Sequence, residues 1–171
     1  KFSHYFQDRM LIQDFSPDEF SKFRQQLQIS CDMEDLDFIH SEKLQSFLSK
    51  FQSPVSYLDF EAFQTAIPPF LGVSPYEQIP FQFSLHIDDQ VLQHHCYIAP
   101  PNVDPREMLL SSLKDVLPST GSVVVYNKQY ETLILNTLKK QFPESAPFIE
   151  DLISRLIDLE DPFKKKFIYL R

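Results

Sequence analysis

The fold is decided by one stretch of the chain, Pro54-Val55-Ser56-Tyr57-Leu58-Asp59-Phe60-Glu61-Ala62-Phe63. Its side chains follow the two-residue period of a β-strand, in which alternate side chains leave from opposite faces. Leu58 and Phe60 are apolar, so we expect a central strand that is buried on both faces. Asp59 and Glu61 stand two residues apart and therefore leave from the same face.

Two neighbouring carboxylates on one buried face repel each other, and burying them costs more than the strand can easily offset. A divalent cation that prefers oxygen ligands, Mg²⁺ or Mn²⁺, would turn this repulsion into attraction. The alternative is that the two acids form a solvated strand end. Asp59 and Glu61 are therefore candidate metal ligands, and a third ligand would favour the metal over the solvated end.

The composition is typical of one globular domain, or one domain with a small appendage. The chain has 171 residues, of which 43% are apolar, with 17 Phe, 7 Tyr and no Trp, so an aromatic core is expected. Its two glycines, Gly72 and Gly121, exclude a glycine-rich phosphate loop. The net charge of −8 argues against strong stand-alone binding of nucleic acid. It does not exclude a site where metal ions bridge to phosphate.

Cellular location and chain context follow from a few further features. Cys31 and Cys96 are isolated, so neither a zinc site nor a disulfide framework is expected. No apolar run approaches membrane-spanning length, and the N-terminus lacks the apolar region of a signal peptide. We therefore expect a soluble, cytoplasmic protein. The chain opens on Lys1 and stops abruptly at Arg171, so we expect a segment of a longer chain with other domains, truncated at its C-terminus.

Residues 1–51 are expected to form a helical lead-in to the main domain. The sequence Ser16-Pro17-Asp18-Glu19 predicts a helix start, with Ser16 as N-cap and Glu19 closing a capping box. An acidic connector is expected at residues 31–40, and a second helix at residues 41–51.

The main domain, residues 52–171, is expected to be of the α/β class. Strands are predicted at 54–63, 78–87, 91–98, 122–126 and 156–159, and helices at 104–117, 129–142 and 147–153. The first three strands have short-range connections typical of an antiparallel meander, whereas the wholly apolar strand 122–126 is typical of a central parallel strand. The prediction is a mixed sheet flanked by helices. A Pro-rich loop of about fifteen residues follows the first strand, and loops of that length tend to be functional.

A further acid follows the predicted parallel strand 122–126. Asn127 follows the strand 122–126 and is expected to cap the next helix, from whose first turn Glu131 projects. A carboxylate in the first turn also complements the helix dipole, which is a sufficient structural reason for Glu131.

These residues resemble a known group of enzymes. Leu58-Asp59-Phe60-Glu61 followed by Asn127-x-x-Tyr130-Glu131 resembles motifs I and II of the DEDD 3′–5′ exonucleases, and the order of elements resembles the ribonuclease-H-like fold. More closely, residues 54–170 resemble DUF2779, an uncharacterised bacterial domain placed in that superfamily. The phrases that carry this resemblance include Ala66-Ile67-Pro68-Pro69-Phe70, Ile79-Pro80-Phe81-Gln82-Phe83-Ser84-Leu85-His86, Gly121-Ser122-Val123-Val124-Val125-Tyr126-Asn127 and Arg155-Leu156-Ile157-Asp158-Leu159.

The resemblance implies a metal-dependent nuclease that hydrolyses phosphodiesters of DNA or RNA with two Mg²⁺ or Mn²⁺ ions. It implies that Asp59 bridges both ions and that Glu61 orients the nucleophilic water or shares an ion. Glu131 would hold the second ion, at a position where the family normally has Asp. The implied partner is a single-stranded nucleic-acid end, and no membrane.

Supporting residues are expected around these three acids. The last acid of the family pattern follows Tyr or His on a late helix, and Asp158 lacks such a neighbour. We therefore expect that ligand beyond Arg171 and assign Asp158, with Asn127, a supporting role. His86 and Phe63 are candidates to line a substrate groove, with a surface position and core packing as their respective alternatives.

Three other polar residues are expected to stay outside the site. His94 and His95 are adjacent on one strand, so they point to opposite faces and cannot chelate an ion together. Arg106 is expected to face solvent or to pair with neighbours of Glu107. Two alternatives to a nuclease stay open: a catalytically incomplete module with a protein-interaction or structural role, and another phosphoryl hydrolase on the same scaffold.

Overall fold

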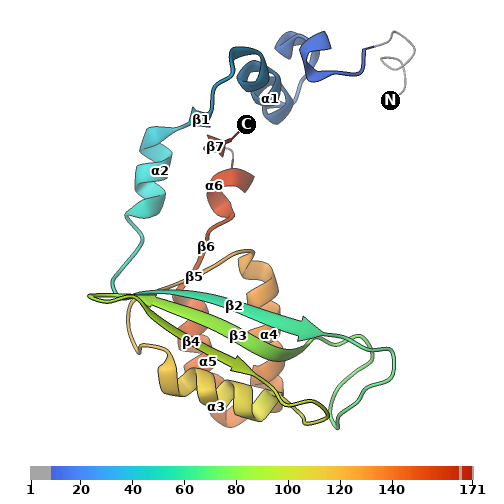
Figure 1. Cartoon of the computed structure of the whole chain (residues 1–171), viewed down its shortest axis with the longest axis vertical. Helices are drawn as coiled ribbons and strands as arrows, with labels where there is room; N and C mark the ends of the chain where they lie inside the picture. The colour runs from blue at the N-terminus through green and yellow to red at the C-terminus, as the bar shows by residue number, and fades with distance from the viewer. Residues whose placement is uncertain (1–8, 166, 171) are drawn as a thin grey trace. The chain divides into compact units, whose positions relative to one another are not determined.

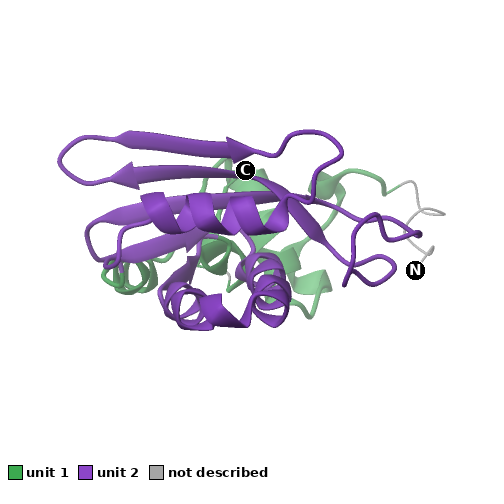
Figure 2. Ribbon diagram, turned by 90° about the horizontal axis from the view of Figure 1, so that it is seen from below, with its two compact units in different colours: residues 1–50, 160–171 green, residues 51–159 purple. Residues whose placement is uncertain are grey.

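A computed structural model describes residues 9–165 and 167–170. The chain divides into two compact units (Figure 2). Unit 1 contains residues 1–50 and 160–171, and unit 2 contains residues 51–159. The three candidate acids all belong to unit 2.

Unit 2 is built on a five-stranded mixed sheet in the order β4-β3-β2-β5-β6 (Figure 1). Its elements are β2 (Val55–Phe63), β3 (Ile79–Asp88), β4 (Gln93–Ile98), α3 (Arg106–Val116), β5 (Ser122–Val125), α4 (Lys128–Gln141), α5 (Ala146–Ser154) and β6 (Leu156–Asp158). β3 runs antiparallel to β2 and β4, whereas β5 runs parallel to β2 and β6. The predicted mixed sheet with flanking helices is therefore confirmed, with each element close to its expected place.

The central strand β2 has one covered face and one open face. Ser56, Leu58 and Phe60 are buried, whereas Asp59 and Glu61 are exposed. The expectation of burial on both faces is therefore wrong. The reason is visible in Figure 2, where the helices of unit 2 gather on one side of its strands.

The covered face of the sheet supplies one side of a single hydrophobic core. The other side comes from α3, α4 and α5, whose apolar residues recur every three or four positions, as on one face of an amphipathic helix. The core residues include Leu58, Phe60, Phe83, Leu85 and Ile87 from the strands and Leu109, Leu113, Ile134, Leu135, Leu138, Ile149 and Leu152 from the helices.

The parallel pairing of β2 with β5 is fixed by a close backbone approach at Gly121. Gly121 has φ +87°, and a Cβ atom there would lie 2.0 Å from the Pro54 carbonyl oxygen, so no larger residue fits. The N–H of Ser122 donates to the Gln52 carbonyl at 2.9 Å. The Gln52 N–H in turn donates to Ser122 Oγ at 2.9 Å. These contacts set the register in which β5 pairs with Val55, Ser56 and Tyr57, just before Asp59.

The Pro-rich loop after β2 is fastened to two helices. The Arg106 guanidinium donates to both carboxylate oxygens of Asp104, at 2.8 and 2.6 Å, and to the Leu71 carbonyl at 2.9 Å. Gln141 Nε2 donates to the neighbouring Gly72 carbonyl at 3.2 Å. Arg106 is 4% exposed, so it does not face solvent. It forms an ion pair with Asp104, three residues before Glu107, which agrees with the alternative expectation of a partner near Glu107.

Unit 1 is smaller and mostly helical. Its elements are the 3₁₀ turns η2 (Ile12–Asp14) and η3 (Pro17–Glu19), the helices α1 (Phe23–Glu34), α2 (Ser41–Leu48) and α6 (Asp161–Lys164), and the strands β1 (Phe38–Ile39) and β7 (Ile168–Tyr169). β1 and β7 pair antiparallel. Among the helices of residues 9–165 and 167–170, none is long and apolar enough to cross a membrane.

The predicted helix start in unit 1 forms a shorter element than expected. The Ser16 N–H donates to Glu19 Oε1 at 2.8 Å, as a capping box requires, but the turn that follows is the 3₁₀ turn η3. The α-helix begins at Phe23 and continues to Glu34. The prediction of an acidic connector from residue 31 is therefore wrong over its first four residues, which lie in α1.

Candidate functional site

Asp59 and Glu61 lie on the open face of the sheet, near the point where β2 loses its parallel neighbour. Across the antiparallel pair, Asp59 stands opposite Ser84 and Glu61 opposite Gln82. The register between β2 and β3 shifts after Glu61, which is a bulge of the kind that re-aims side chains at sites. The pairing of β5 with β2 ends at Tyr57, so β5 does not cover the backbone that carries the two acids.

The start of α4 is anchored so that its first turn faces this exposed part of β2. The Asn127 N–H donates to Asp158 Oδ1 at 3.2 Å, and Lys128 Nζ donates to the Leu156 carbonyl at 2.7 Å. Asn127 adopts a left-handed conformation, φ +68°, and its side chain makes no capping hydrogen bond. The prediction that Asn127 caps this helix is confirmed by its N-cap position, with its backbone carbonyl accepting from the Tyr130 N–H at 3.0 Å. Asp158 holds the Asn127 backbone, which ties α4 to β6.

Glu131 extends from the first turn of α4 into the protein and is 1% exposed. Its carboxyl group accepts a hydrogen bond from the Phe60 N–H on β2, between the two other acids in sequence. The oxygen Oε2 of Glu131 is buried and has no hydrogen-bond partner among the described residues. A buried carboxyl oxygen without a partner is rare and calls for an explanation, such as a role in binding a water or an ion.

The three acids interact electrostatically. The pKa of Glu131 is raised from 4.5 to about 8, first by burial and then by the charge of Asp59, with a smaller contribution from Glu61. The Phe60 N–H acts in the opposite direction, because it stabilises the carboxylate. Without a cation, Glu131 therefore holds its proton at neutral pH. The charges of Asp59 and Glu61 on β2 therefore act on the buried carboxyl group in the first turn of α4.

Tyr130 is a member of this site that the sequence did not single out. The pKa of its phenol is raised, first by burial and then by the charges of Glu131, Glu61 and Asp59. The hydroxyl therefore lies close enough to feel all three acids. The available signal was its position next to Glu131 in a motif that resembles the DEDD pattern.

The acids are near one another but do not form a preformed cage. Within residues 9–165 and 167–170, no three His, Cys, Asp or Glu side chains are grouped closely enough to hold a metal ion as they stand. Charges interact over about 10 Å at moderate ionic strength, whereas an oxygen ligand must approach Mg²⁺ to about 2.1 Å. The exposed side chains of Asp59 and Glu61 would have to turn toward Glu131 to bind an ion.

Phe63 and His86, the two residues expected to line a groove, lie in different surroundings. Phe63 lines a pocket of about 320 Å³ beyond Glu61, together with Phe70 and Phe81. The rings of Phe63 and Phe81 lie 6.1 Å apart. His86 lies on the open face opposite Tyr57, one cross-strand position away from Asp59. Both residues flank Asp59 and Glu61. Among the described residues, neither shows an interaction with Glu131.

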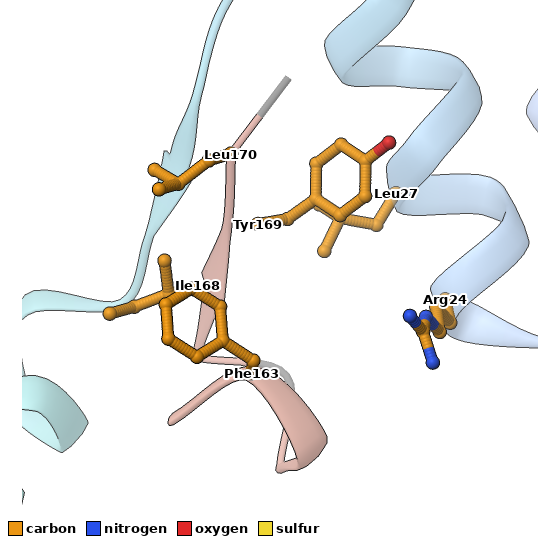
Figure 3. A pocket seen from close by; sticks show the side chains of 6 residues that line it. All are labelled: Arg24, Leu27, Phe163, Ile168, Tyr169 and Leu170. Carbon is orange, nitrogen blue, oxygen red and sulfur yellow. The ribbon is translucent and has the colours of Figure 1, made fainter. Parts of the chain in front are cut away.

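Another hollow lies entirely within unit 1 (Figure 3). It has a volume of about 240 Å³ and is lined by Arg24 and Leu27 of α1 and by Phe163, Ile168, Tyr169 and Leu170. The lining is largely apolar, with Arg24 as its charged member. It therefore lacks the cluster of acids that distinguishes the site in unit 2.

The matches to known proteins are limited to one family. No curated protein and no solved structure matches the chain. One family profile, described as Domain of unknown function (DUF2779), matches residues 56–171, which is well over half of the chain. The matched range includes all three acids. The predicted resemblance to DUF2779 is confirmed, and the chain belongs to the DUF2779 family.

Proposed function

We propose that this domain is a metal-dependent nuclease that hydrolyses phosphodiesters at a single-stranded end of DNA or RNA. Asp59, Glu61 and Glu131 would hold two Mg²⁺ or Mn²⁺ ions, which supply an activated water and stabilise the leaving oxygen. In this proposal the domain is a ribonuclease-H-like member of the DEDD 3′–5′ exonuclease superfamily.

The observation that carries the proposal is the state of Glu131. Its carboxyl group is buried beside two other acids, its pKa is raised to about 8, and Oε2 has no partner. A fold gains no stability from this arrangement, because burial and repulsion both disfavour the charged form. Two cations beside the three carboxyls would remove both penalties and release the proton from Glu131. Strongly perturbed acids of this kind are enriched at catalytic sites.

Two further features support nucleic acid as the substrate. The sheet has three antiparallel strands followed by two parallel ones, with the paired acids on its central strand, as the resemblance to the ribonuclease-H-like fold implies. The pocket lined by Phe63, Phe70 and Phe81 begins two residues beyond Glu61. Aromatic side chains in such a position can stack on bases without reading their sequence.

Each acid has a distinct role in the proposed reaction. Asp59 from β2 and Glu131 from the first turn of α4 would hold the cations. Glu61, one strand repeat further on, would orient the attacking water. The charges of all three acids act on the Tyr130 phenol, whose hydroxyl would position a phosphate oxygen.

The test is Mn²⁺ binding, measured by isothermal titration calorimetry at pH 7. We expect the chain to bind Mn²⁺ and expect both Asp59→Asn and Glu131→Gln to abolish binding. Asp88→Asn is the matched control, because it removes an exposed carboxylate from β3 about 13 Å along the sheet from Asp59. Absence of binding by the unmodified chain, or equal binding by all variants, would overturn the proposal.

Hydrolysis is then measured with the same chain and its variants. Labelled single-stranded DNA and RNA with free or blocked 3′ ends are the substrates, and we expect Mn²⁺-dependent shortening from a free 3′ end. Asp59→Asn should remove this activity, whereas Asp88→Asn should not.

One observation favours the second candidate, a catalytically incomplete module with an interaction or structural role. The described residues include no preformed group of three metal-ligating side chains. Under this alternative Glu131 stays protonated, and the titration shows no Mn²⁺ binding. The calorimetric experiment therefore separates the two candidates.

A further inference from the structure

Two histidines stack on the open face of the sheet, beginning one cross-strand position from Asp59. His86 on β3 and His94 on β4 are paired directly across the strands. Their rings lie 4.3 Å apart between centroids, with 17° between the ring planes. Both side chains are exposed. The pair is therefore reachable from solvent and is held together by the β3–β4 ladder.

The surroundings of the pair include a hydroxyl and a thiol. Ser84 Oγ lies 3.3 Å from His94 Nε2, within hydrogen-bond distance. Cys96 follows His94 by two residues on β4 and stands opposite Ser84, so it leaves from the same open face. Its thiol is free and exposed. Two imidazoles and a thiol are soft or borderline ligands, unlike the carboxylates on β2.

We propose that His86 and His94 form a binding site for a borderline divalent cation of the Zn²⁺ class, with Cys96 as a further ligand. Opposite residues of an antiparallel pair have Cβ atoms about 5 Å apart, and zinc binds imidazole nitrogen at about 2.0 Å. One ion between the rings therefore spans the pair. The rings must turn about their Cβ–Cγ bonds so that their lone pairs converge, and their exposure leaves room for this turn.

The thiol is not yet in place in this arrangement. No group of three metal-ligating side chains is preformed within the described ranges. Before the side chains rotate, the ligands available at this site are therefore the two histidines. A change of rotamer at Cys96 would bring a third ligand to the ion, and water would complete the tetrahedron. Ser84 would act as a positioning residue that orients the His94 ring through its hydrogen bond.

This site is chemically separate from the proposed nuclease centre. Imidazole and thiolate prefer zinc and its neighbours, whereas carboxylates, carbonyls and water suit Mg²⁺ and Mn²⁺. Zinc at His86 and His94 would therefore bind whether or not the acids hold magnesium. A cation there would also clamp β4, the edge strand of the sheet, to β3.

The test is a Zn²⁺ titration of the metal-free, reduced chain, followed by calorimetry and by the NMR signals of the histidine rings. We expect binding with shifts confined to His86 and His94. His86→Gln and His94→Gln should each lower the affinity at least tenfold, and Ser84→Ala should lower it about tenfold. His95→Gln is the matched control, since His95 is adjacent to His94 but stands opposite Leu85 on the covered face. It should bind zinc as the unmodified chain does.

Two outcomes would overturn the proposal: zinc binding that survives both His86→Gln and His94→Gln, or zinc binding that is undetectable in the unmodified chain. Cys96→Ser decides the ligand set, because unchanged affinity would remove the thiol from the proposal. Circular dichroism checks that each variant keeps its fold, as expected for exposed positions. Asp59→Asn should leave zinc binding intact while it abolishes Mn²⁺ binding, so failure of one proposal is distinguishable from failure of the other.

Discussion

The two faces of the β2–β3–β4 sheet are made of different chemistry. On the covered face, Leu58, Phe60, Phe83 and Leu85 are at most 3% exposed and pack against three helices. On the open face, the same strands present acids, histidines, a serine and a cysteine. Because alternate residues of a strand belong to opposite faces, one stretch of sequence can specify a core and a site at once.

The difference between the faces shows how the free energy of folding is distributed. Burial of large apolar side chains on the covered face provides the main driving force, at about 25 cal/mol per Å². Side chains on the open face can then be chosen for chemistry, since water solvates them in the folded and unfolded chain alike. Glu131 is the exception, because it is a buried acid whose charge is costly in the protein interior.

The largest expected effect tests the difference in burial between the two faces of the sheet. Phe83→Ala should lower the free energy of unfolding by about 4 kcal/mol, because it removes a buried ring and leaves a cavity. Ser84→Ala, its neighbour on the opposite face, should change stability by less than about 0.5 kcal/mol. Urea denaturation followed by circular dichroism measures both values. Similar losses for the two variants would show that the open face is covered in solution.

The next effect concerns Glu131 and the pH dependence of stability. In the metal-free folded chain Glu131 keeps its proton up to a pKa of about 8, whereas the unfolded chain releases it near 4.5. The folded state therefore binds more protons between these values, and stability falls as the pH rises. The contribution is full below pH 4.5 and lost above pH 8. We expect a loss of roughly 3 kcal/mol over this range, allowing for relaxation of the site.

Glu131→Gln is the variant that isolates this titration. The amide has the shape of the protonated acid but no charge, so stability should no longer fall steeply between pH 5 and pH 8. Denaturation curves at several pH values, with EDTA present, give the comparison. A steep fall that persists in Glu131→Gln would place its origin in another group. Addition of Mn²⁺ to the unmodified chain should flatten the curve, because a cation stabilises the charged carboxylate.

Much of the fold could be predicted because it depends on local pattern. The two-residue period of β2 and β3 and the apolar run of β5 give the strands and their direction. Which face would be covered could not be predicted in the same way. The residues Leu58 and Phe60 fit a strand covered on one face as well as a strand covered on both.

The site could be predicted less completely, because its contacts join distant parts of the chain. Spacing brought Asp59 and Glu61 to one face, and a resemblance added Glu131. The hydrogen bond from the Phe60 N–H to Glu131 and the bond from Asn127 to Asp158 have no local signal in the sequence. The stacking of His86 on His94 depends on the register of β3 with β4, which a one-residue slip would have undone.

The smallest effect is the most specific, because it links stability to the proposed function. Asp59→Asn removes the neighbouring charge that most raises the pKa of Glu131. At pH 8, without metal, this variant should be more stable than the unmodified chain by about 1 kcal/mol, which corresponds to less than one pKa unit. At pH 5 the two should be equally stable, since Glu131 is protonated in both.

With Mn²⁺ present, the order at pH 8 should reverse, because the unmodified chain gains binding energy that Asp59→Asn cannot gain. Asp88→Asn provides the reference, since it changes the net charge equally and should show neither the gain nor the reversal. Equal stability of Asp59→Asn and the unmodified chain at pH 8 would mean that the acids are not coupled. A gain without a reversal would mean that they are coupled but bind no cation. Glu131 destabilises the fold when no metal is bound, and a bound cation would offset this cost. The stability measurements with and without Mn²⁺ test whether a cation does so.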